Sequence, residues 1–75
     1  MTTKEKILAN KIKSLNARWH REMEEHERQY ESRFNNLPTN DDEEVIAEAI
    51  LELNKWSRER IAEIRRRWTE GVLNA

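Results

Sequence analysis

The amino-acid sequence predicts an all-α fold in which two long helices form an antiparallel hairpin. The chain of 75 residues contains a single proline, Pro38, and a single glycine, Gly71. Apolar residues recur at helical spacing on both sides of the proline. Charged residues make up 39% of the chain, which suits the outer surfaces of two exposed helices. A single domain this small is marginal without a partner.

The first helix is expected over residues 3–36. Its apolar residues advance in steps of three and four, which makes an eleven-residue repeat typical of nearly straight helices. Pro38 disfavours helical dihedral angles at the residue before it, so the helix is expected to stop at a turn over residues 37–40. The apolar stripe consists of Leu8, Ile12, Leu15, Trp19, Met23, His26, Tyr30, Phe34 and Leu37.

The second helix is expected over residues 41–70, followed by a short tail. Thr39 or Asn40 is expected to cap its start, and the acidic residues at positions 41–44 suit the positive end of the helix dipole. Gly71 is expected to cap its end. Folding the chain about the turn would pair residues whose numbers add up to about 76, such as Leu8 with Trp68. The stripe of this helix consists of Ile46, Ile50, Leu53, Ser57, Ile61, Ile64, Trp68 and Val72.

The first half of the second helix is apolar around most of its circumference, which predicts self-association. One neighbouring helix covers a single side, whereas a helix that is apolar all round is normally buried on several sides. We therefore expect a homodimer that forms a four-helix bundle. Its seam is predicted to contain Leu8, Ile12, Leu15, Trp19, Met23, Tyr30, Ile46, Ile50, Leu53, Ile61, Ile64 and Trp68, and a separate partner interface to contain Val45, Ala49 and Trp56.

The net charge of −1 hides a strong polarity along the hairpin. Residues 1–21 and 55–75 carry twelve basic and four acidic side chains, a net +8, whereas residues 22–54 carry two basic and eleven acidic side chains, a net −9. Solvated helix faces are the simplest interpretation. A second hairpin lying in the opposite sense would also set each basic end beside an acidic one.

The basic ends give RNA or DNA as an alternative ligand. Several phosphates could be neutralised there, although interspersed glutamates and a pI near 6.1 make nucleic acid the less favoured partner. The candidate contacts are Lys4, Lys11, Arg58, Arg65, Arg66 and Arg67.

The sequence contains no recognisable catalytic or metal-binding pattern. The two histidines, His20 and His26, are six residues apart and point to different faces, and neither completes the Glu-x-x-His pattern of di-metal bundles. Without a cysteine, a glycine-rich phosphate loop or a convergent Ser/His/Asp set, we expect no enzyme activity, cofactor or metal. His26 lies on the stripe and is a candidate pH-sensitive group, either buried and neutral or paired with Glu22.

The expected function is a protein–protein interaction or small regulatory module that acts as a helical homodimer, with another protein as a further partner. The apolar runs are too short to cross a membrane, no small-molecule substrate is indicated, and the composition favours the cytoplasm. Two alternatives stay open: a nucleic-acid-binding bundle, and a designed bundle without biological function. Straight helices joined by one turn are typical of designs, whereas Asn10, Asn16 and Asn54 inside the helices are not.

Overall fold

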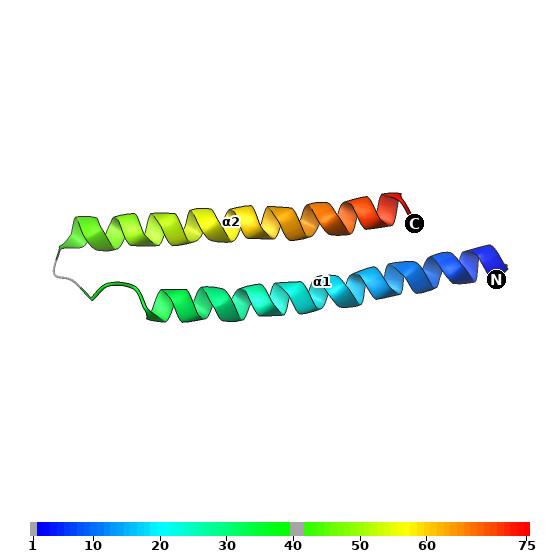
Figure 1. The fold of residues 1–75 in the computed structure, drawn as a ribbon, viewed down its shortest axis with the longest axis horizontal. Coiled ribbons are helices and arrows are strands. Elements are labelled where there is room, and N and C mark those ends of the chain that lie inside the picture. The colour runs from blue at the N-terminus through cyan, green and yellow to red at the C-terminus, as the bar shows by residue number, and fades with distance from the viewer. Residues whose placement is uncertain (1, 40–41) are drawn as a thin grey trace.

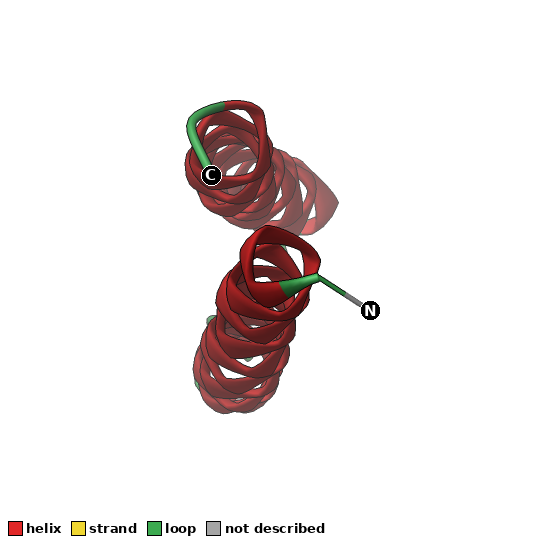
Figure 2. Ribbon diagram, turned by 90° about the vertical axis from the view of Figure 1, so that its right-hand side faces the viewer, coloured by secondary structure: helices red, strands yellow, loops and turns green. Residues whose placement is uncertain are grey.

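The computed structural model describes residues 2–39 and 42–75. These residues form two α-helices, α1 (Thr3–Asn35) and α2 (Glu43–Leu73). The helices lie antiparallel and side by side (Figure 1), and the Cα atoms extend over 63 × 17 × 10 Å. Viewed from its end, the described part of the chain has no third element on either side of the helix pair (Figure 2). The predicted all-α hairpin is confirmed.

The ends of α1 follow from local hydrogen bonds. The Thr2 hydroxyl accepts a hydrogen bond from the Glu5 amide at 3.2 Å, and the Glu5 carboxylate accepts one from the Thr2 amide at the same distance. This reciprocal pair is a capping box, which satisfies two amides that the helix itself cannot. At the other end Asn36 is the cap, and its side-chain amide donates to the Ser32 carbonyl at 2.8 Å. The helix therefore ends two residues before Leu37, the position at which Pro38 disfavours helical dihedral angles.

The start of α2 differs from the sequence prediction. Asp42 caps the helix, and its carboxylate accepts a hydrogen bond from the Glu44 amide at 3.0 Å. Thr39 lies in the connecting segment and is not the cap. The other predicted cap, Asn40, and the predicted first helical residue, Asp41, lie outside the described residues.

The end of α2 was also predicted wrongly, because the helix continues through Gly71 to Leu73 and is capped by Asn74. A Cβ atom at position 71 would lie 2.7 Å from Cδ2 of Leu15 on α1, so a larger residue there would require the end of the Leu15 side chain to shift. Gly71 therefore packs directly against Leu15 near the open end of the hairpin.

The register between the helices is offset from the predicted one by about two turns. The indole N–H of Trp68 donates to Asn16 Oδ1 at 2.8 Å, and the hydroxyl of Tyr30 donates to Asn54 Oδ1 at 3.0 Å. The numbers in each pair add up to 84, so the predicted pairing of Leu8 with Trp68 is wrong. The reason is visible in Figure 1: residues 36–39 run along the long axis instead of reversing at once.

The offset leaves the first eight residues of α1 beyond the end of α2, where Figure 1 shows the N-terminal end projecting. Leu8, predicted to lie in the seam, is consequently 42% exposed. In the seam itself only Leu53 and Ile64 are fully buried apolar residues among those described. Ile61, another predicted seam residue, is exposed. The remaining predicted seam residues are half-buried: Ile12, Leu15, Trp19, Met23, Tyr30, Ile46, Ile50 and Trp68.

Candidate functional site

Helical spacing places the side chains that flank the seam on two broad faces, one on each side of the plane through both helices. We name them by their chemistry. The apolar face consists of Trp19, Met23, Tyr30 and Phe34 from α1 and Ile61 from α2. The ionic face consists of Arg18 and Glu22 from α1 and Arg60, Glu63 and Arg67 from α2.

The apolar face is open along its length. Trp19, Met23, Tyr30 and Ile61 line one shallow groove, to which His26 also contributes. The ring of Tyr30 stacks on that of Phe34, with centroids 6.4 Å apart, so the apolar surface continues toward the loop. Phe34 is 52% exposed and Ile61 37%. A continuous apolar surface of this kind marks an interaction site more often than isolated exposed residues do.

Two asparagines hold the aromatic side chains at the border of this face. Asn54 accepts the Tyr30 hydroxyl proton and Asn16 accepts the Trp68 indole proton, each across the seam. Sequence reasoning treated these asparagines only as weak helix formers. The sequence signal for this role was the presence of a weak helix former inside a helix, because asparagine is best tolerated there when its side chain gains a hydrogen-bond partner.

His26 occupies the middle of the seam and is only 5% exposed. Its Nε2 lies 2.9 Å from the Ser57 hydroxyl, and its ring centroid lies 5.1 Å from that of Trp56. Its Nδ1 is buried without a hydrogen-bond partner among the described residues. Burial lowers the pKa of His26 below its ordinary value, and the positive charge of Arg60 lowers it further.

Of the two states that the sequence left open for His26, the structure places it in the buried one. Glu22 does not pair with it, because Glu22 binds arginines on the ionic face. The pH sensitivity of His26 stays a prediction.

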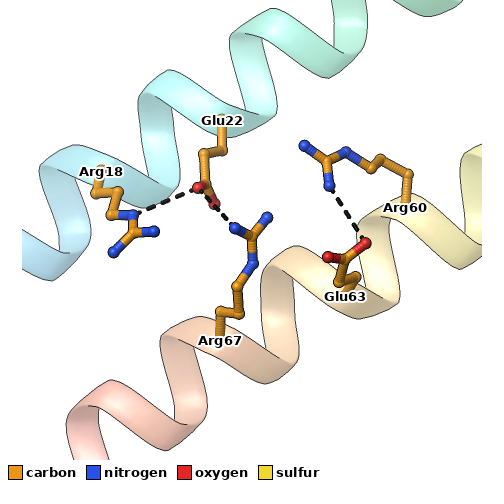
Figure 3. Close-up of polar contacts among 5 residues, drawn as sticks. All are labelled: Arg18, Glu22, Arg60, Glu63 and Arg67. Atoms are coloured by element: carbon orange, nitrogen blue, oxygen red, sulfur yellow. Dashed lines mark hydrogen bonds and ion pairs between the residues drawn. The ribbon is translucent and has the colours of Figure 1, made fainter.

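The ionic face uses its charges within the hairpin (Figure 3). Glu22 Oε1 lies 3.4 Å from Arg18 Nε on the same helix and 3.4 Å from Arg67 Nη1 on the other helix. Arg60 pairs with Glu63 at 3.2 Å. Arg67 was predicted to contact nucleic acid, but its guanidinium instead lies in a small recess that Leu15, Trp19, Glu22, Ile64 and Trp68 also line.

The predicted partner interface of Val45, Ala49 and Trp56 lies on the same side of the hairpin as the ionic face. Trp56 is half-buried inside the hairpin, because its ring packs beside His26 and the guanidinium of Arg33 covers it at 3.9 Å. Ala49 is half-buried and Val45 is 38% exposed. This side therefore offers much less free apolar surface than the apolar face.

The other candidate nucleic-acid contacts fall in two separate places. Arg58, Arg65 and Arg66 line a shallow hollow on the outer side of α2, and Lys4 and Lys11 line another near the start of α1. None of these five forms an ion pair with a residue that the structure describes. They do not make one basic surface together with Arg67.

Within residues 2–39 and 42–75, neither helix is sufficiently long and apolar to span a membrane. The same residues contain no cluster of three histidine, cysteine, aspartate or glutamate side chains that could bind a metal ion. No protein-family model, curated protein or solved structure matches the chain.

Proposed function

We propose that the protein is a non-enzymatic interaction module that acts as a helical homodimer, in which two apolar faces pack together as a four-helix bundle. The asymmetry between the two faces carries this proposal. Phe34 and Ile61 are exposed on one face, while the charged residues of the other face pair among themselves. A second hairpin supplies the layer that the apolar face lacks.

The small buried core supports the same proposal. Only Leu53 and Ile64 are fully buried apolar residues among those described. Each large apolar side chain that moves from water into a packed interface contributes about 1.5–3 kcal/mol when fully covered. Pairing the apolar faces therefore adds further buried apolar surface to that of the single hairpin. Association of this kind is how small helical domains commonly become stable.

The double variant Phe34→Glu/Ile61→Glu tests the proposal. Sedimentation equilibrium should give a dimer for the unaltered protein at micromolar concentration and a monomer for the variant. Val45→Glu is the matched control, because Val45 is as exposed as Ile61, at 38% against 37%, but lies on the other side of the hairpin. A 9 kDa monomer for the unaltered protein, or dissociation by Val45→Glu alone, would contradict the proposal.

A variant that unfolds when it dissociates is still informative. For a dimer that unfolds to two chains, the melting temperature rises with protein concentration. The unaltered protein and Val45→Glu should show this dependence, and Phe34→Glu/Ile61→Glu should have lost it.

Nucleic-acid binding is the second candidate function, favoured by the unpaired Arg58, Arg65 and Arg66 in one hollow. If they bind phosphates, Arg58→Gln/Arg65→Gln should weaken binding to an RNA or DNA duplex and flatten its salt dependence. Binding to neither duplex at low salt would remove this candidate.

A further inference from the structure

The outer border of the apolar face on α1 carries charges of both signs, sorted along the helix. Lys6, Lys13 and His20 are spaced by seven residues, close to two helical turns, and so lie in one row. Glu24, Glu27 and Glu31 continue that row toward the loop. His20, Glu24 and Glu27 also line the groove of the apolar face. We call these six residues the charged border of α1.

None of the six forms an ion pair with a residue that the structure describes. This contrasts with the ionic face, where Arg18, Glu22, Arg67, Arg60 and Glu63 are all paired. The order of charge also opposes the dipole of α1, because the lysines lie near its positive N-terminal end. No ion pair among the described residues therefore compensates the arrangement.

We propose that the charged border of α1 binds the same border of α1 in a second copy, running in the opposite direction. This inference rests on the proposed dimer and specifies its orientation. A twofold axis perpendicular to the long axis brings one apolar face onto the other with the loops at opposite ends. In that arrangement α1 lies on α1 of the second copy and α2 lies on α2.

The observed register predicts which residues meet. Because numbers across the seam add up to 84, the first residue of α2, Glu43, lies level with position 41 of an extended α1. Measured along its axis in residue numbers of α1, the hairpin therefore extends from about 3 to about 41, and its centre lies near residue 22. A twofold axis there sets Lys13 beside Glu31 of the second copy and His20 beside Glu24 of the second copy, and each contact occurs twice.

The parallel orientation lacks this complementarity. Loops at the same end would place α1 against α2 of the second copy, with both +8 ends together and both −9 ends together. Repulsion between like ends disfavours that dimer. With the loops at opposite ends, the same register on α2 sets Arg58 near Arg65 of the second copy, a like-charge contact that opposes the proposed orientation. The charged border of α1 favours the proposed orientation against that repulsion, while the apolar residues provide the association.

Charge exchange between two variants tests the proposal. Lys13→Glu and Glu31→Lys should each self-associate about tenfold more weakly than the unaltered protein, because the two attractive contacts between Lys13 and Glu31 become repulsive. Mixed in equal amounts, the two variants should form a heterodimer at least as tight as the unaltered dimer. Lys11→Glu changes the charge equally at a position off the border, and should not show this specific rescue.

The outcomes separate this inference from the proposed function. A monomeric unaltered protein would overturn both. A dimer whose two border variants fail to rescue each other at low salt would overturn only the orientation. Thr39→Cys gives an independent measurement: rapid disulfide formation would mean that the loops are adjacent, and would also overturn it, since the hairpin is 63 Å long.

Discussion

The two faces of the hairpin are built from the same two helices, yet they differ in whether their side chains have partners within the hairpin. On the ionic face Glu22 joins Arg18 and Arg67, so charges are neutralised across the seam. On the apolar face Phe34 and Ile61 are exposed without a covering layer among the described residues. Charged groups of the ionic face thus find partners within the hairpin, whereas the apolar face is the side on which we expect a partner.

The strongest test of this comparison changes two leucines that are two residues apart. Leu53 is 7% exposed in the seam, whereas Leu51 is 64% exposed on the outer side of α2. Leu53→Glu should destabilise the fold by about 3 kcal/mol or more, because an unpaired carboxylate is buried. Leu51→Glu should leave the seam and the apolar face intact. Circular dichroism melts and sedimentation of both variants measure the difference. Equal effects on helix content would mean that the seam is placed wrongly.

A smaller effect is expected from pH, through His26 between the two faces. Its folded pKa lies below the unfolded value of about 6.5, so the unfolded chain binds the proton first. Stability should be complete above that value, should fall as the pH drops through it, and should level off below the folded pKa. Denaturant unfolding between pH 8 and pH 5 measures this loss.

The matched control for the pH prediction is His26→Gln, which keeps a hydrogen-bonding group beside Ser57. Over the same interval its stability should vary less with pH. If both proteins showed the same pH dependence, other groups would be responsible and His26 would not act as a switch.

The smallest effect is expected on the ionic face. Glu22→Gln removes the negative charge shared by Arg18 and Arg67, whose side chains are 60% and 34% exposed. Solvent screens such contacts, so the free energy of unfolding should fall by less than about 1 kcal/mol, and dimerisation should not change. A larger loss in urea unfolding, or a loss of the dimer, would make the ionic face part of the interface.

The sequence was sufficient for those features that depend on local rules. The helical spacing of the apolar residues predicted both helices, Pro38 predicted where α1 stops, and the stripe placed His26 in the packed seam. These inferences succeeded because each depends on the periodicity or dihedral preference of a short segment.

The register failed because it depends on geometry between segments. It follows from the path of residues 36–39 along the axis and from the close approach of Leu15 to Gly71, and neither has a sequence signature of its own. The contrast between the two faces was missed for a related reason. Whether Arg67 faces solvent or reaches Glu22 depends on which flanks of the two helices share a side, and only the folded pair reveals that.

The offset register also divides the backbone of α1 into two parts that should move differently. Residues 3–10 have no helix opposite them in the single hairpin, so they are held mainly by their own turns and the capping box at Thr2, with Ala75 beside Ile7 and Leu8. Amide hydrogens there can exchange with solvent through local fraying, whereas those around the buried His26 require the hairpin to open. The projecting end of α1 is thus a segment whose order depends on what lies beside it, and slowed exchange there would report a bound partner directly.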